Sequence, residues 1–243
     1  MYKIIITAGG TSEKIDNVRK ITNSSTGKLG SVIATKMLEI YGHRIEKIYY
    51  LCSKNSIRPV NKKIEIVEIS DTESLEFSVK KWLTENNIDY FIHSMAVSDY
   101  SVDYITTAEN LAMEIEKNNK DTFQTICNFD KKCADNKISS SYENLIIKLK
   151  RTPKIISIIK DISPKTYLVG FKLLDDVSEN ELINTACKLK EKNKCDLVVA
   201  NDLKNIREGN HKAFIIKSRV DYLVAFGKDD IANKLVKEMI KND

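Results

Sequence analysis

An apolar run near the start of the chain, Ile4–Ile6, is followed by a pair of glycines, Gly9 and Gly10. A short apolar run bounded by glycine is typical of a buried parallel strand, and glycine after it lets backbone N–H groups approach an anion closely. A second glycine-bearing segment, residues 23–30, leads into a helical pattern, whose N-terminus adds a positive dipole end. The two turns indicate either a nucleotide or phosphate cradle, or a tight turn and a helix cap, because neither G-x-G-x-x-G nor G-x-x-x-x-G-K-[ST] is present.

The rest of the chain alternates apolar runs with amphipathic segments. This alternation predicts an α/β fold built from βαβ units: a Rossmann-like, mostly parallel sheet flanked by helices. Ligands bind beyond the carboxyl ends of such strands, where the strand order reverses, so the site is expected at the turns after the first strand and after residues 89–93. The other strands are predicted at 47–52, 64–69, 144–148, 167–172 and 195–200, a hairpin at 212–216 and 222–225, and helices at 31–41, 71–85, 153–156, 176–192 and 227–241.

Two segments allow a more detailed or only a weaker prediction than the others. The helix at 71–85 is expected to be capped by Asp71 and to turn Phe77, Val79 and Trp82 toward the core. Between residues 101 and 135 the pattern weakens, which indicates one or two helices and an irregular excursion.

Three polar features are candidates for binding. Asp99, at the end of the turn that follows residues 89–93, either accepts a proton from a ligand or caps the next segment. Residues 135–141 are rich in serine and predict a mobile loop of the kind that acts as a lid. Lys188 and Lys192 are four residues apart on one helix, so they either meet one anion together or form a solvated face.

Charge and cysteine content narrow the class of protein. The 39 basic and 34 acidic residues are interspersed, which argues against the basic stripe of a nucleic-acid-binding protein and fits small anionic substrates. No apolar stretch is long enough to span a bilayer and no signal peptide is recognisable, so we expect a cytoplasmic protein without a membrane partner. The five cysteines lack a C-x-x-C pair and the three histidines lie far apart, so free thiols and no protein-built metal site are expected.

Six motifs, in this order and spacing, resemble the phosphopantothenate–cysteine ligases (phosphopantothenoylcysteine synthetases), and the resemblance covers nearly the whole chain. It implies a single domain over residues 1–243, of the stand-alone type without a fused decarboxylase. The sequence departs from many bacterial relatives at Met95, where they carry alanine, and at residues 172–175, where they carry Ala-Ala-Glu-Thr. The motifs are AGGTSEKIDNVRKITNSSTGKLG at 8–30, AVSDY at 96–100, Lys137-Ile138, Thr152–Ile155, Val169–Phe171 and DLVVAND at 196–202.

The resemblance implies a ligase of coenzyme A biosynthesis that acts through an acyl-nucleotidylate. A nucleoside triphosphate activates the carboxylate of 4'-phosphopantothenate and releases pyrophosphate; the amine of L-cysteine then displaces the nucleoside monophosphate. CTP is favoured over ATP by the family, and Mg²⁺ is expected to be held mainly through the nucleotide phosphates. The family is also expected to form a homodimer with shared active sites, through a smaller hairpin or flap region, with a mobile lid at about 128–143.

Site residues follow from the same resemblance. Asn23 and Lys137 are the implied catalytic residues: Asn23 holds the acyl group, and Lys137 stabilises charge at the α-phosphate. Arg19 is implied to reach across the dimer interface to the substrate phosphate, which its planar fork suits. Met95, Ala96 and Asp99 are implied to line the pantothenate arm. The implied nucleotide-binding residues are Gly9, Gly10, Ser25, Gly27, Gly30, Asp99, Lys137, Pro153, Lys154, Ile155, Ile156, Phe171, Lys188, Lys192 and Asn201.

Two other classes of protein share a Rossmann-like sheet. One is an NAD(P)-binding reductase, against which the missing G-x-G-x-x-G and the lack of a clear acidic residue at the end of the second strand argue. The other is a non-catalytic nucleotide-binding protein, which the sequence alone does not separate from an enzyme.

Overall fold

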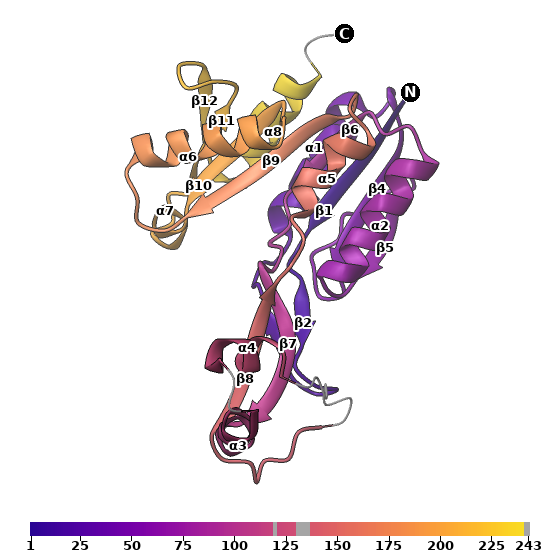
Figure 1. The fold of residues 1–243 in the computed structure, drawn as a ribbon. Coiled ribbons are helices and arrows are strands. Elements are labelled where there is room, and N and C mark those ends of the chain that lie inside the picture. The colour runs from indigo at the N-terminus through magenta and orange to yellow at the C-terminus, as the bar shows by residue number, and fades with distance from the viewer. Residues whose placement is uncertain (119–120, 130–136, 241–243) are drawn as a thin grey trace.

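The computed structural model describes residues 1–118, 121–129 and 137–240 and centres on one eight-stranded sheet (Figure 1). Its strand order is β12-β11-β10-β9-β6-β1-β4-β5. The six strands from β10 to β5 pair in parallel, and β11 and β12 add an antiparallel edge. The strands are β1 (Tyr2–Ala8), β4 (Ile45–Ser53), β5 (Ile64–Ile69), β6 (Tyr90–His93), β9 (Tyr167–Leu174), β10 (Leu197–Asp202), β11 (Lys212–Ile216) and β12 (Tyr222–Phe226).

The parallel strands follow the doubly wound order. Chain order runs outward from β1 to β4 and β5 on one side, then returns to β6, β9 and β10 on the other. The order therefore reverses between β1 and β6, so the loops after these two strands meet at the switch point where such sheets bind ligands. The α/β class, the parallel sheet and the hairpin at 212–216 and 222–225 are confirmed.

Helices cover both faces of the sheet. Alternate residues of the buried strands contribute to two apolar clusters, because successive side chains of a strand point to opposite faces. The helices α1 (Lys28–Tyr41) and α8 (Gly227–Met239) cover one face, and α2 (Thr72–Glu85), α5 (Ile155–Ile162) and α6 (Glu179–Lys192) cover the other. None of the described helices is long and apolar enough to cross a membrane.

The inward residues of α2 differ from the prediction. Asp71 caps the helix as predicted, with Ser74 completing a capping box, and Val79 is buried. Phe77, however, is 68% exposed, so its predicted burial is wrong. The buried positions of α2 recur every three to four residues, and a residue two positions from Leu75 and from Val79 falls on the opposite side of the helix.

A second region projects from the carboxyl edge of the sheet (Figure 1). It is an arm of two antiparallel strands, β7 (Tyr100–Thr107) and β8 (Leu145–Arg151), with α3 (Ala108–Asn118) and α4 (Thr122–Cys127) at its end. A hairpin of β2 (Ser12–Lys14) and β3 (Lys20–Thr22) lies beside β7. The strand predicted at 144–148 is part of this arm, whereas β2, β3 and β7 were not predicted.

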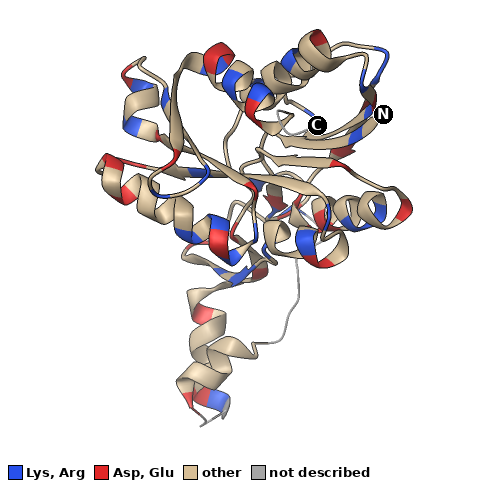
Figure 2. Ribbon diagram, turned by 90° about the horizontal axis from the view of Figure 1, so that it is seen from above, with Lys and Arg blue, Asp and Glu red and all other residues tan. Residues whose placement is uncertain are grey.

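The distribution of charged residues and the state of the described cysteines agree with the predictions from the sequence. Figure 2 shows Lys and Arg interspersed with Asp and Glu over the ribbon. The cysteines at 52, 127, 187 and 195 are free thiols, as predicted, and Cys133 lies outside the described residues. The short helix α7 (Leu203–Arg207) connects β10 to the antiparallel edge.

Candidate active site at the sheet switch point

The loop after β1 is packed backbone to backbone against the start of α1. Gly9 and Gly27 have φ angles of +86° and +71°, in the left-handed region that only glycine enters without strain. A Cβ on Gly27 would lie 3.0 Å from the backbone nitrogen of Gly9, and one on Gly9 would lie 1.9 Å from Oγ of Ser56. Glycine is therefore required at both positions, and the two glycine turns predicted from the sequence form one structure.

Gly10 brings the β2–β3 hairpin against the same loop. A Cβ there would lie 1.7 Å from the carbonyl oxygen of Asn23, which leaves room for hydrogen only. The backbone N–H of Asn23 donates to Thr11 at 3.1 Å, and that of Thr11 donates to Ala96 at 3.1 Å. The segments carrying Gly10, Asn23 and Ala96 are thereby joined through main-chain hydrogen bonds, as expected of loops that meet at a switch point.

Asn23 presents a side chain to solvent from this junction. Its Nδ2 donates to the carbonyl of Val97 at 2.9 Å, which fixes the orientation of the amide while the residue stays exposed. Met95, two residues before Val97, is 8% exposed and belongs to the apolar cluster under α2, α5 and α6. The structure thus places Asn23 beside the segment 95–97.

The N-terminus of α1 is open toward the same loop. Its N-cap is Gly27, which has no side chain to cap the helix, and no acidic residue lies in its first turn. The N–H of Lys28 donates to Oγ1 of Thr26 at 3.4 Å. Gly30 packs so closely on the end of β1 that a Cβ would lie 2.7 Å from Cβ of Ala8. Ser25, just before the cap, is exposed. First-turn N–H groups beyond Lys28 have no acceptor within the helix, and together with the helix dipole they make this end of α1 suited to phosphate.

A third segment is held to the switch point by an ion pair. Lys154 and Asp99 form a salt bridge, although both side chains are about two-thirds exposed, at 64% and 63%. Oγ1 of Thr152 donates to the carbonyl of Ser98 at 2.5 Å, and the backbone N–H of Thr152 donates to the carbonyl of Asp99 at 3.1 Å. Asp99 does not cap a helix. The helix predicted at 153–156 is present as α5, which begins two residues later than predicted, at Ile155, beside the turn that carries Asp99.

Phe171 and Asn201 lie on neighbouring strands toward the same edge. Phe171 packs against the apolar cluster under α1 and α8. The cross-strand partner of Phe171 on β10 is Val199, and Asn201 lies two residues after Val199 on the same strand. Asn201 is 6% exposed, and its Nδ2 has no hydrogen-bond partner among the described residues. A buried amide donor without a partner costs free energy unless a ligand or water accepts from it.

The structure does not bring Lys188 and Lys192 to this edge. The helix α6 starts near the carboxyl edge, after β9, and returns to the amino edge, where the N–H of Asp196 donates to Leu168 at the start of β9. Both lysines lie in the last turns of α6 and are exposed, on the sheet face opposite α1. Helical spacing made them neighbours, but the direction of the helix places them away from the other predicted residues.

Arg19 and the segment after Lys137 meet at the tip of the β2–β3 hairpin, around a carboxylate that sequence reasoning missed. Asp16 has a fully buried side chain, and Arg19 donates to its Oδ2 through Nε at 3.0 Å and Nη2 at 2.7 Å. Nη2 also donates to the carbonyl of Ile138, at 2.8 Å. Burial raises the pKa of Asp16, but hydrogen bonds from Arg19, Val18 and Ile138 outweigh it and hold the pKa well below its usual range.

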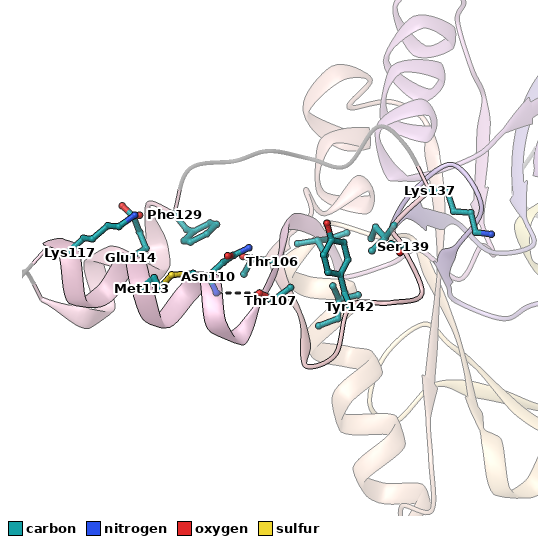
Figure 3. A pocket seen from close by; sticks show the side chains of 13 residues that line it. Thr106, Thr107, Asn110, Met113, Glu114, Lys117, Phe129, Lys137, Ser139 and Tyr142 are labelled. Atoms are coloured by element: carbon teal, nitrogen blue, oxygen red, sulfur yellow. Dashed lines mark hydrogen bonds between the residues drawn. The ribbon is translucent and has the colours of Figure 1, made fainter.

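Lys137 itself is exposed and stands at one end of a groove of about 710 Å³ (Figure 3). The groove runs along the arm between α3 and the segment from Ile138 to Leu145. Lys117 and Glu114 lie at its far end, and the side chain of Lys137 points away from them. Of the predicted lid at 128–143, residues 130–136 lie outside the described residues.

His93 ends β6 directly beneath the site. Its Nδ1 lies 2.8 Å from Oγ1 of Thr7, and burial lowers its pKa from the ordinary 6.5 to about 4. The unfolded chain therefore binds a proton below pH 6.5 that the folded chain does not accept until about pH 4. Because the unfolded state binds more protons in this window, stability falls as the pH drops through it.

We expect His93→Gln to remove this pH dependence. Between pH 7 and pH 4 the wild-type protein should lose up to about 3 kcal/mol more of its free energy of unfolding than the variant. Urea denaturation of both proteins at a series of pH values measures the difference. Parallel pH profiles for the two proteins would show that His93 is protonated equally in the folded and unfolded states.

These features define a class: a doubly wound α/β protein whose glycine turns and helix N-terminus lie at the switch point of the sheet, with a buried amide on β10. A profile of the family described as the DNA/pantothenate metabolism flavoprotein C-terminal domain matches residues 1–130 and 125–242. The chain belongs to this family. A crystal structure of the DNA/pantothenate metabolism flavoprotein from Streptococcus pneumoniae is 35% identical, covers all of both chains and superposes with a TM-score of 0.83.

Other relatives are longer proteins. The coenzyme A biosynthesis bifunctional protein CoaBC of Thermococcus kodakarensis is 33% identical over 98% of this chain, which spans 51% of that protein. CoaBC of Methanocaldococcus jannaschii is 27% identical, with 98% of this chain and 50% of that protein covered. The chain thus spans about half the length of these curated relatives. The fold also matches a Cab2 mutant in complex with phosphopantothenate-cysteine, with a TM-score of 0.71, 18% identity, and coverage of 99% of this chain and 85% of that one.

Proposed function

We propose that this protein is a phosphopantothenate–cysteine ligase that joins 4'-phosphopantothenate and L-cysteine through an acyl-nucleotidylate. The observation that carries the proposal is the junction of Gly10, Asn23 and Ala96 at the switch point, in a chain whose relatives are named for coenzyme A biosynthesis. The complex of the Cab2 mutant with phosphopantothenate-cysteine adds support, because that structure shares the fold.

The nucleotide occupies the glycine side of the junction in this proposal. Gly9, Gly10 and Ser25 line the triphosphate, and the open end of α1 at Gly27 and Gly30 supplies N–H groups and a positive dipole end. The buried Nδ2 of Asn201 gains an acceptor on the nucleotide, and Phe171 and residues 153–156 complete its site. CTP is the favoured nucleotide. We assign Mg²⁺ mainly to the nucleotide phosphates, because this ion is usually bound through substrate phosphates and few protein carboxylates.

The pantothenate arm lies on the other side of the junction. Asn23 donates to the acyl group, and Met95 and Ala96 form the wall next to it. Asp99 faces both ligands, and its ion pair with Lys154 holds the two halves of the site together while it neutralises the carboxylate near anionic substrates. The phosphate at the far end of the substrate is assigned to Arg19 of a second copy of the chain.

A homodimer is part of the proposal because the arm exposes large apolar side chains. Monomeric proteins keep such side chains scattered, whereas clusters on one projection mark contact surfaces. The arm and the adjacent hairpin tip expose Val18 (65%), Tyr100 (50%), Met113 (47%), Phe123 (66%), Tyr142 (57%) and Leu149 (41%).

The chemistry consists of two displacements. A carboxylate oxygen of phosphopantothenate attacks the α-phosphorus and expels pyrophosphate; the amine of cysteine then attacks the acyl carbon, loses a proton and expels the nucleoside monophosphate. Negative charge accumulates at the α-phosphoryl group in both steps. A lysine ammonium at that position stabilises both transition states, and Lys137 is assigned to it.

A pyrophosphate-release assay tests the function. We expect release only when phosphopantothenate and a nucleoside triphosphate are both present, faster turnover with CTP than with ATP, and an amide product once cysteine is added. Phosphopantothenate reduction or NAD(P)H oxidation would identify a reductase instead. Nucleotide binding without pyrophosphate release under any condition would identify a non-catalytic nucleotide-binding protein.

A further inference from the structure

We propose that Thr11 is a positioning residue whose buried hydroxyl sets the orientation of the Asn23 amide. It acts through the peptide bond between Val97 and Ser98. The inference rests on the proposed function for the role of Asn23. Its physical basis is a closed ring of hydrogen bonds among these four residues, which links the β2–β3 hairpin to the loop after β6.

Thr11 lies between the glycine turn after β1 and the start of β2, and it is fully buried. Its backbone N–H donates to the carbonyl of Ala96 at 3.1 Å, and its carbonyl accepts the N–H of Asn23, also at 3.1 Å. Its Oγ1 accepts the N–H of Ser98 at 2.8 Å and donates to Oγ of the same serine at 3.0 Å. The residue therefore connects the hairpin to the loop after β6 through both its backbone and its side chain.

The peptide unit that joins Val97 to Ser98 is held at both of its polar groups. Its carbonyl accepts Nδ2 of Asn23 at 2.9 Å, and its N–H donates to Oγ1 of Thr11 at 2.8 Å. The N–H of Asn23 donates in turn to the carbonyl of Thr11, which closes the ring. Because a trans peptide bond is planar, with its C=O and N–H on opposite sides, the Thr11 hydroxyl fixes the direction in which the carbonyl of Val97 points.

The direction of that carbonyl decides how Asn23 presents its amide. A carbonyl only accepts, so Nδ2 rather than Oδ1 must face Val97. Nδ2 carries two hydrogens, and the bond to Val97 leaves the second one for an acyl oxygen of the substrate. Asn23 is exposed, so packing contributes little to the orientation of its amide. Loss of the Thr11 hydroxyl therefore lets the peptide unit rotate and releases the amide.

A second buried threonine provides a matched control. Thr166 is also fully buried, and its Oγ1 binds the carbonyl of Ile88 and Oγ of Ser163, both at 2.7 Å. It lies just before β9, at the amino edge of the sheet and away from the switch point. Thr166→Val therefore removes a hydroxyl of equal burial without touching the ring.

Thr11→Val tests the hydroxyl, because valine has the shape of threonine and lacks the polar group. In the folded variant we expect kcat for pyrophosphate release to fall at least about tenfold and KM for the nucleotide to change less than about twofold, since misorienting a group that positions the substrate costs rate. Thr11→Ser restores the hydroxyl and should return to within about threefold of the wild type. Thr166→Val should keep wild-type kcat and KM, with urea denaturation giving the folded fraction of each protein.

A double-mutant cycle shows whether Thr11 acts through Asn23. In an Asn23→Ala background we expect Thr11→Val to lower kcat by less than about twofold further, because the group that it positions is already absent. Thr166→Val combined with Asn23→Ala should give the product of the two single effects. Equal effects of Thr11→Val in the two backgrounds would contradict the inference.

Hydrogen exchange of the Ser98 amide tests the ring without ligase activity. The amide should exchange at least about tenfold faster in Thr11→Val, where it has lost its acceptor, and at the wild-type rate in Thr166→Val. An unchanged rate in Thr11→Val would overturn the inference even in an active enzyme. Failure of the proposed function is distinguishable, because it appears as absent pyrophosphate release by the wild-type protein and leaves this measurement unaffected.

Thr11→Cys covers the case in which Thr11→Val does not fold. Cysteine and serine have similar shapes, but a thiol is a weak acceptor, so Thr11→Cys and Thr11→Ser differ chiefly in hydrogen bonding. We expect lower kcat and faster exchange of the Ser98 amide in Thr11→Cys than in Thr11→Ser. Equal kcat and equal exchange for these two variants would show that the hydroxyl is not required.

Discussion

Replacing Lys137 with glutamine is expected to lower the rate of amide formation by about 10²–10³-fold while leaving the fold intact. The side chain is exposed, so its loss removes no buried contact. Glutamine keeps most of the length and a donor but removes the positive charge that we assign to the α-phosphoryl group. The loss should therefore fall on kcat in both half-reactions and much less on KM, as happens when an interaction forms only in the transition state.

The matched control is Lys165→Gln, an exposed lysine in the loop before β9. Single-turnover measurements of pyrophosphate release and of amide formation, with thermal denaturation of each variant, separate catalysis from folding. We expect Lys165→Gln to resemble the wild type in all three. Near-normal amide formation by Lys137→Gln would remove this lysine from the proposed mechanism and leave charge stabilisation to the helix end at Gly27.

The central sheet was predictable because its signals are local. Each buried strand is a short apolar run, and Ile4–Ile6 illustrates this, since all three side chains are fully buried. The alternation of such runs with amphipathic helices then fixes parallel pairing, and parallel pairing fixes which loops meet. The expectation that the turns after β1 and β6 come together thus required no knowledge of side-chain contacts.

The arm, and the hydrogen bonds that join Asp16 to Arg19 and to residue 138, were not predictable in the same way. Strand β7 carries β-branched and aromatic residues, but its burial depends on β8, whose paired residues are 38 to 51 positions away in the sequence. In sequence, Asp16 is one more carboxylate in a polar connection, and only the docking of residue 138 shows that it joins two segments. The same limit explains Lys188 and Lys192: their spacing was visible, but the direction of α6 relative to the sheet was not.

Replacing Gly10 with alanine is expected to lower activity more than the same replacement at any other glycine of the site. The new Cβ would lie 1.7 Å from the carbonyl oxygen of Asn23, whereas real Cβ atoms keep about twice that distance. The obstacle is backbone, so no side-chain rotation relieves it. Either the loop after β1 or the β2–β3 hairpin must move by more than 1 Å, and both carry proposed ligand contacts.

The expected cost is about 2–4 kcal/mol in the free energy of unfolding, together with loss of more than about 100-fold in kcat/KM. Urea denaturation and the pyrophosphate assay measure the two effects separately. Gly209→Ala is the control for the added methyl group, because a Cβ there meets nothing within 4 Å although its φ is +86°. Strain at such a left-handed position costs about 1–2 kcal/mol, and we expect full activity from that variant.

The comparison of the two glycine variants isolates what the junction does. If close packing served stability alone, Gly10→Ala and Gly209→Ala would lose activity only in proportion to the unfolded fraction, and both would be active under stabilising conditions. If the junction positions Asn23 for the acyl group, Gly10→Ala stays inactive where it is fully folded. Activity of folded Gly10→Ala close to that of Gly209→Ala would contradict the placement of Asn23 in the site. Inactivity of the folded variant ties catalysis to the contact between the first glycine turn and the hairpin.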